Sequence, residues 1–184
     1  TDWLRKTYVD IIAVKPDMKV TAAVFASRTD AYTNRFQDWS NWMQGNMLDA
    51  LLPMNYSTSN STFNSRTDDA AAHKFNRHAY MGNAAYLNTK ENTVTQLSYA
   101  RSKNLQGLIT YSYANTNSAG DSAAVFYQYI KDNLFSVPES VPPMYWKSAP
   151  VGGYLRGTVT DALTGEPVYN AVVTITDLSL TIQT

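Results

Sequence analysis

A short apolar run that ends in polar residues lies between two stretches with helical spacing of apolar side chains. It covers Leu48 to Ser57 and reads LDALLPMNYS, with a break at Pro53. Such a run predicts a strand of an α/β layer, because the carboxyl ends of parallel strands deliver polar side chains into loops. We therefore expect a functional site to lie at that end of the strand.

Helical and strand patterns alternate before this run and after it. Helical spacing occurs over Asp2–Val14, Arg35–Gln44, Arg66–Asn76, Glu91–Ser102 and Asp121–Leu134. Strand patterns occupy Met18–Ala26, Leu48–Asn55, His78–Ala85 and Gly107–Tyr113. We expect Gly45 to cap the second helix, and Gln96 and Arg101 to be exposed on the fourth. The alternation implies right-handed crossovers and a parallel sheet, so the predicted fold class is α/β.

The character of the chain changes after Phe135. Residues 137–153 read VPESVPPMYWKSAPVGG, without periodicity, and predict a linker. Beyond it, alternating residues predict strands over Leu155–Thr160 and Val172–Thr176, joined by a turn over Asp161–Pro167. We therefore expect three parts: an α/β unit over 1–136, a linker over 137–153, and the first strands of a β-sandwich module over 154–184.

Composition narrows the class of partner. Fifteen basic and fifteen acidic residues cancel, so no charge excess favours nucleic acid or an anionic membrane. No apolar stretch approaches the roughly 18 residues of a membrane span. The absence of cysteine excludes disulfides and thiolate metal sites, and leaves the compartment open. These properties favour a neutral or weakly charged ligand.

Aromatic residues point to the chemistry of that ligand. The chain has 13 Tyr, 4 Trp and 6 Phe, beside many Asn and Ser. Aromatic faces stack on the C–H faces of sugar rings, and amides pair with sugar hydroxyls. The alternative is that the aromatic residues form the core. The Ser-rich segments Ser57–Ser65 and Asn115–Ser122 follow strand ends, and could bind sugar or be solvated connections.

Metal and cofactor sites are not predicted. The two histidines, His73 and His78, are expected on a helix surface and at a strand entry, without converging carboxylates. No Gly-rich phosphate loop and no nucleophile elbow occurs, since Gly82, Gly152 and Gly153 lack the required spacing.

Three segments carry a combination of motifs. They read DWSNWMQGNMLDALLPMNYS (Asp38–Ser57), AYMGNAAYLN (Ala79–Asn88) and TQLSYARSKNLQGLITYSYAN (Thr95–Asn115). The motif positions are Asp49, Pro53, Tyr56, Gly82, Gly107, Tyr111 and Ser112. This combination resembles the second half of the glycosyl-hydrolase-like family 10, bacterial (β/α)8 barrels related to cell-envelope glycosidases. The resemblance covers Thr1 to Leu134 and implies strands five to eight, the C-terminal half, of a TIM-type barrel.

The tail carries a second resemblance. The segment Gly157–Asp177 reads GTVTDALTGEPVYNAVVTITD. It looks like the opening of a carboxypeptidase-regulatory-like β-sandwich, which is a common appendage of secreted bacterial enzymes. Together the two resemblances imply part of an exported glycoside hydrolase that acts on a cell-envelope or other polysaccharide. We expect a secreted, periplasmic or cell-envelope location, with the export signal outside this segment.

Glycoside hydrolysis needs two carboxyl groups that flank the bond. The resemblance places the main acids on strands one to four, outside this chain, so we expect this segment alone to be inactive. Asp30 is the candidate catalytic acid within the chain, whereas Asp68 and Asp69 are expected in the first turn of a helix and Asp49 at the structural end of its strand.

The predicted contribution of this chain is therefore sugar binding. The candidate subsite residues are Arg28, Asn55, Tyr56, Asn83, Tyr86 and Tyr113. A non-catalytic carbohydrate-binding or scaffold protein is the alternative. Since a half-barrel would leave two unpaired strand edges, self-association of the segment is a third expectation.

Overall fold

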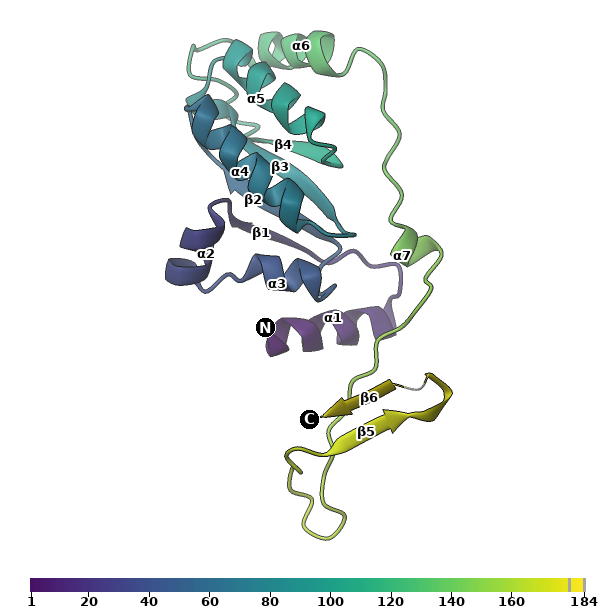
Figure 1. Ribbon diagram of the computed structural model, residues 1–184. Coiled ribbons are helices and arrows are strands. Elements are labelled where there is room, and N and C mark those ends of the chain that lie inside the picture. The colour runs from purple at the N-terminus through teal and green to yellow at the C-terminus, as the bar shows by residue number, and fades with distance from the viewer. Residues whose placement is uncertain (179, 184) are drawn as a thin grey trace. The chain divides into compact units, whose positions relative to one another are not determined.

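A computed structural model describes residues 1–178 and 180–183 of the chain (Figure 1). It divides into two compact units, Thr1–Val151 and Gly152–Thr184. The sheet, its helices and the candidate site all belong to the first unit.

The first unit is built on a parallel sheet of four strands. The strands are β1 (Thr21–Phe25), β2 (Ala50–Asn55), β3 (His78–Ala84) and β4 (Gly107–Tyr111). Their spatial order, β1-β2-β3-β4, is their order along the chain, and each strand is parallel to the next. The predicted α/β class with a parallel sheet is therefore confirmed.

Helices connect the strands. They are α1 (Asp2–Val14), α2 (Arg28–Arg35), α3 (Trp39–Gln44), α4 (Asn60–His73), α5 (Lys90–Ser102) and α6 (Ala123–Leu134), with a 3-10 turn η1 at Ala85–Leu87. The first α-helix after each strand of the four-stranded sheet has a hydroxyl N-cap: Ser27, Ser59, Thr89 and Ser122. Each of these side chains accepts a hydrogen bond from a backbone N–H of the first turn, which fixes where the helix begins.

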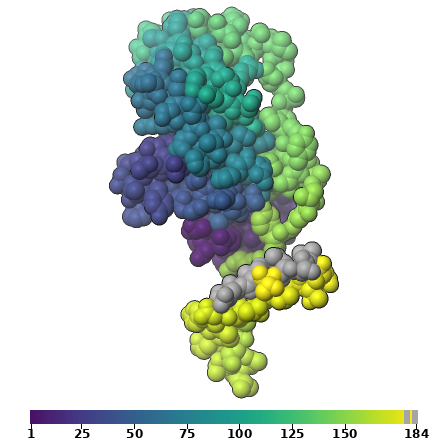
Figure 2. Space-filling model, in the orientation of Figure 1, coloured from purple at the N-terminus to yellow at the C-terminus, as the bar shows by residue number. Residues whose placement is uncertain are grey.

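The core lies between the sheet and its helices. Val24, Leu51 and Ala79, one residue from each of three adjacent strands, pack with Trp39 and Met43 of α3. Farther along the sheet, Met81 packs with Phe63 and Ala70 of α4 and Ala100 of α5. Figure 1 shows α4 and α5 against the same face of the sheet. In the space-filling view of Figure 2, the segments of the first unit that are coloured from blue to teal pack closely against one another.

The opposite face of the sheet has a different character. Strand residues alternate between the two faces, so Ala23, Leu52, Tyr80 and Ile109 lie opposite the helical core. These side chains are half-buried or exposed, whereas the core-facing Val24, Leu51 and Met81 are buried. We call the residues of this second face the open face.

Four local predictions need correction. Residues 28–35 form α2, a helix that the sequence patterns did not predict, so Asp30 belongs to a first helical turn. The Ser-rich segment Ser57–Ser65 is mostly helix, because α4 begins at Asn60. Asp68 and Asp69 consequently lie in the middle of α4, not in its first turn. Gln96 was expected to be exposed but is fully buried.

The segment predicted as a linker contains a short helix, α7 (Tyr145–Ser148). Its residues contact the amino ends of the strands: the Trp146 ring lies 5.1 Å from the His78 ring, and Lys147 Nζ lies 3.2 Å from Asp49 Oδ2. Asp49 precedes β2 and is fully buried. The first unit therefore extends through much of the segment over 137–153, which we expected to be a linker.

The second unit contains an antiparallel pair, β5 (Val172–Ile175) and β6 (Leu180–Gln183), joined through a 3-10 turn at Thr176–Leu178. The strand predicted over Leu155–Thr160 is wrong, since among these residues only Thr160 forms a β-bridge, to Pro167. Asp161 builds the turn between Thr160 and Pro167, because its carboxylate accepts hydrogen bonds from the backbone N–H groups of Leu163 and Thr164.

Candidate functional site at the carboxyl ends of the strands

Three tyrosines from three successive strand ends form one aromatic cluster. Tyr56 follows β2 directly, Tyr86 lies in η1 after β3, and Tyr111 is the last residue of β4. The rings of Tyr56 and Tyr111 are stacked, with centroids 5.6 Å apart and planes 20° apart. Tyr86 meets both edge-on, at 6.4 Å from Tyr56 and 6.0 Å from Tyr111. We call these three residues the tyrosine cluster.

The tyrosine cluster is accessible from solvent. Tyr111 is 53% exposed and Tyr86 is 36% exposed, whereas Tyr56 is half-buried between them. Burial raises the pKa of Tyr56 above its ordinary value, and the neighbouring Tyr111 and Tyr86 raise it further. Its hydroxyl therefore stays neutral at physiological pH and can both donate and accept a hydrogen bond.

The chemistry available to such a cluster is stacking combined with neutral hydrogen bonding. Offset and edge-on aromatic pairs contribute about 0.5–1.5 kcal/mol beyond the area they bury, so the rings support each other in the absence of a ligand. An apolar ring face beside a hydroxyl suits a ligand that is apolar on one side and hydroxylated at its rim.

Two of the predicted subsite residues belong to the tyrosine cluster, namely Tyr56 and Tyr86. Tyr113 does not: its ring stacks on Tyr127 of α6, with centroids 6.0 Å apart, and it is 82% exposed. Tyr111 was recognised in the sequence only as a motif residue. The predicted strand ran two residues too far, to Tyr113, and a strand that ends at Tyr111 delivers that tyrosine to the site.

The predicted subsite asparagines point into the protein. Asn55 and Asn83 are register partners on β2 and β3, and both are fully buried. Asn55 Nδ2 donates to the carbonyl oxygen of Phe63 at 2.9 Å, and Asn83 Nδ2 donates to Gln96 Oε1 at 2.6 Å. These bonds join the strands to α4 and α5, so the two amides support the strand ends from the helical side.

Arg28 and Asp30 lie near the amino end of α2 and have partners of their own. Arg28 Nε lies 3.1 Å from Asp69 Oδ1 of α4. Asp30 accepts a hydrogen bond from Asn34 Nδ2 at 2.7 Å and lies 3.4 Å from Arg35 Nε. The hydrogen bond from Asn34 lowers the pKa of Asp30, and Arg35 lowers it further. Asp30 is therefore an ionised, half-buried carboxylate with no feature of a protonated general acid.

The other helical carboxylates are also paired. Asp68 accepts from the Tyr99 hydroxyl at 2.8 Å and lies 2.8 Å from Lys103 Nζ, whose hydrogen bond lowers the pKa of Asp68. Within residues 1–178 and 180–183, the His, Asp and Glu side chains form no group of three or more that could hold a metal ion. Asp30, Asp68 and Asp69 are thus each paired with a partner on the helices.

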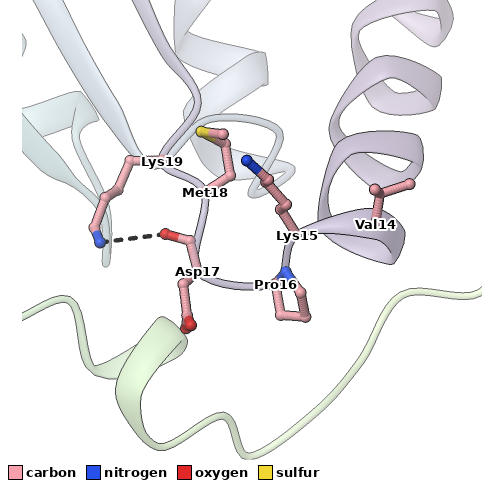
Figure 3. A pocket seen from close by; sticks show the side chains of 6 residues that line it. All are labelled: Val14, Lys15, Pro16, Asp17, Met18 and Lys19. Atoms are coloured by element: carbon pink, nitrogen blue, oxygen red, sulfur yellow. Dashed lines mark hydrogen bonds between the residues drawn. The ribbon is translucent and has the colours of Figure 1, made fainter.

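A surface hollow lies elsewhere, in the turn between α1 and β1. Figure 3 shows its lining, which comes from one continuous stretch, residues 14–19. The Lys19 ammonium donates to the carbonyl oxygen of Asp17 at 3.2 Å. This hollow precedes the amino end of β1, and so lies at the opposite end of the sheet from the tyrosine cluster. It is a groove of the turn and brings together no residues from distant parts of the chain.

Comparisons with known proteins add no family to this description. No protein-family model, no curated protein and no solved structure matches the sequence. In the part of the chain that the structure describes, no helix has the length and apolar character needed to cross a bilayer.

Proposed function

We propose that this chain binds a polysaccharide or oligosaccharide at the tyrosine cluster. The observation that carries the proposal is the convergence of three tyrosine rings, with centroids 5.6–6.4 Å apart, from three successive strand ends. The cluster supplies partly exposed aromatic rings and hydroxyls, which are the groups that stack on sugar C–H faces and pair with sugar hydroxyls. The balanced net charge of the chain also suits a neutral ligand.

The architecture that we propose for the first unit is the C-terminal half, strands five to eight, of a (β/α)8 barrel. Two features support it: the four parallel strands follow each other in chain order, and the helical core lies against one face. A barrel of this type carries its site at the carboxyl ends of the strands, the end at which the tyrosine cluster lies. For the second unit we propose the start of a β-sandwich module.

The parent protein that we propose is an exported bacterial glycoside hydrolase of the cell envelope, in line with the resemblance to glycosyl-hydrolase-like family 10. Its paired catalytic carboxylates would come from outside this chain, and the present chain would supply sugar subsites. The rival is a non-catalytic carbohydrate-binding or scaffold protein. The separate ion pairs of Asp30, Asp68 and Asp69 favour binding without cleavage for this chain under either proposal.

Saccharide binding is best tested by tyrosine NMR. Titration with chitohexaose, cellohexaose and a peptidoglycan disaccharide should shift the ring signals of Tyr56, Tyr86 and Tyr111 in a saturable way. The variant Tyr111→Ala should weaken binding by about tenfold, since loss of one stacking ring is worth about 1–1.5 kcal/mol. Tyr145→Ala is the matched control, because Tyr145 is 68% exposed on α7 at the other end of the sheet. Ring signals that do not respond to any of the three sugars would refute the proposal.

Hydrolysis is tested separately. We expect the purified chain not to cleave a chromogenic glycoside, because the pairing of Asp30 with Asn34 and Arg35 keeps this carboxylate ionised. Turnover by the chain that Asp30→Asn abolishes would show that this carboxylate is catalytic after all.

A further inference from the structure

One buried asparagine, Asn88, lies where the three segments that carry the tyrosine cluster meet. It follows η1 and precedes Thr89, the N-cap of α5, and it is only 2% exposed. Its short side chain reaches neighbours within two residues of Tyr56 and Tyr86, and its backbone reaches the loop that follows Tyr111.

The side chain of Asn88 links the segments of Tyr56 and Tyr86. Its Nδ2 donates to the carbonyl oxygen of Ser57 at 3.2 Å and to that of Ala84 at 2.9 Å. Ser57 is the residue after Tyr56, and Ala84 ends β3 two residues before Tyr86. The carboxamide thus uses both of its N–H donors on two backbone segments that are distant in sequence.

The backbone of Asn88 reaches the third segment. Its carbonyl oxygen accepts a hydrogen bond from the backbone N–H of Ser118 at 2.9 Å. Ser118 lies in the connection between β4, which ends at Tyr111, and α6. The loop that follows Tyr111 is therefore attached to the same residue as the segments of Tyr56 and Tyr86.

Two polar residues of α5 reinforce this arrangement. Gln96 Nε2 donates to the carbonyl oxygen of Ser57 at 3.0 Å, so this oxygen has two buried donors. Asn92 Nδ2 donates to Asn88 Oδ1, which orients the Asn88 carboxamide with its N–H groups toward Ser57 and Ala84. A buried amide whose donors and acceptor are all used is held in one orientation.

We infer that Asn88 is a positioning residue for the tyrosine cluster: it holds the three rings in the arrangement that receives a sugar. Binding to a preorganised surface avoids the entropy of ordering loops when the ligand arrives, so the affinity depends on such fixed support. The inference rests on the proposed saccharide binding for its ligand, whereas the effect of Asn88 on ring geometry can be observed without any sugar.

The test uses two variants and one control in the full chain. Asn88→Asp keeps the size of the side chain, removes both N–H donors and sets an oxygen against the carbonyls of Ser57 and Ala84. Asn92→Ala is milder, because it leaves the Asn88 side chain in place and removes the donor that orients it, together with a 3.4 Å hydrogen bond from Asn92 Nδ2 to the carbonyl oxygen of Thr58. Ala100→Gly is the control: it weakens the same helix, α5, at a buried position that forms no bond with Asn88 in the described structure.

Two readouts separate positioning from general stability. In the sugar-free protein, ring-to-ring nuclear Overhauser effects among Tyr56, Tyr86 and Tyr111 should weaken in both asparagine variants and persist in Ala100→Gly. Affinity for the saccharide that binds the wild type should fall about tenfold in Asn88→Asp and persist in the control. If Asn88→Asp does not fold, Asn92→Ala decides the question through the same readouts.

The outcomes distinguish the two proposals. Unchanged ring contacts in the folded asparagine variants would overturn the positioning role, whatever the affinity. If the wild type binds none of the sugars but the asparagine variants lose the ring contacts, then saccharide binding fails and the positioning role of Asn88 stands.

Discussion

The indole Nε1 of Trp146 donates a hydrogen bond to Oδ1 of Asp49 at 2.6 Å, although 97 positions separate the two residues in the chain. The same Asp49 oxygen accepts from the Tyr8 hydroxyl at 2.7 Å, and the second oxygen accepts from the backbone N–H of Val20 at 2.8 Å. Asp49 therefore joins the first helix, the entry to β1 and the short helix α7. It is a structural carboxylate at the amino end of the sheet, as its place in the sequence predicted.

Removal of the Asp49 charge should destabilise the first unit strongly. Arg77 and Lys147 are both nearly fully buried beside this carboxylate, so Asp49→Asn leaves two buried cations without their counter-charge. Loss of one partner of a buried ion pair costs about 3–5 kcal/mol, whereas Trp146→Phe, which removes one hydrogen bond to a charged group, should cost about 1.5–3 kcal/mol. Urea unfolding measures both. The exposed Trp3 provides the control Trp3→Phe, and equal stability of all three variants would contradict the role of Asp49.

Stability should fall when the pH drops below about 6.5, and His78 should account for part of the loss. Burial lowers the pKa of His78 below its ordinary value of about 6.5, and Lys74 lowers it further, against opposing effects of a backbone hydrogen bond at Pro143 and of Asp49. The unfolded chain therefore takes up the proton first, so the free energy of unfolding decreases from about pH 6.5 down to the folded pKa.

The variant His78→Gln isolates this effect. It should flatten the dependence of the unfolding free energy on pH between 7.5 and 5.5, as measured by urea unfolding at each pH. His73→Gln retains His78 and should keep that part of the slope. A His78→Gln slope that matches the wild type would exclude His78 as the source.

Gly82 should not tolerate a side chain, because β2 lies too close. A Cβ added at Gly82 would lie 2.6 Å from the carbonyl oxygen of Pro53, a backbone atom that can move only with its strand. Gly82→Ala should therefore cost about 1–3 kcal/mol of unfolding free energy. Gly45→Ala is the matched comparison, since its Cβ would lie equally close, 2.6 Å, to the flexible end of Met47. Thermal unfolding should rank Gly82→Ala as the less stable, and the reverse order would contradict the close strand approach.

The chain should self-associate as its concentration rises. In the four-stranded sheet, β1 and β4 are the edge strands, and the open face carries apolar side chains such as Leu52 and Ile109. Unpaired edges and an accessible apolar face favour pairing with another chain. Light scattering should show a mass that grows with concentration, and Ala23→Lys or Ile109→Lys on the open face should reduce it. A monomer at every concentration would mean that other features protect the edges.

The parallel sheet could be predicted because its signals are local. Each strand pattern and each helical stripe stands in one continuous stretch, and the order of the strands in the sheet follows the order in the chain. The helix α2 was missed because RTDAYTNR has almost no apolar periodicity, and only Ala31 of that helix is buried. A hydroxyl cap was nevertheless present in the sequence, since Ser27 accepts a hydrogen bond from the backbone N–H of Asp30.

The candidate site was only partly predictable, because side-chain direction depends on strand register. Asn55 lies two residues after Pro53 and four after Leu51, so it shares their face and points to the helices, whereas Tyr56 points away from them. The alternation of side chains along β2 therefore predicts that Asn55 points toward the helices and Tyr56 away from them. The burial of Gln96 could not be predicted in the same way, because it depends on Asn83, Ser57 and Asn60, which come from two other parts of the chain.

The strand order has a consequence for synthesis on the ribosome. In the four-stranded sheet, every strand after β1 pairs with the strand made just before it, so each βα unit can dock on a surface that has already emerged. Asp49 is the exception, since Trp146 and Lys147 are translated long after the sheet is complete. Until α7 has been made, the Asp49 carboxylate lacks two of its partners. A chain cut short before α7 would keep all four parallel strands, yet it would lose the contact through which Asp49 links α7 to α1.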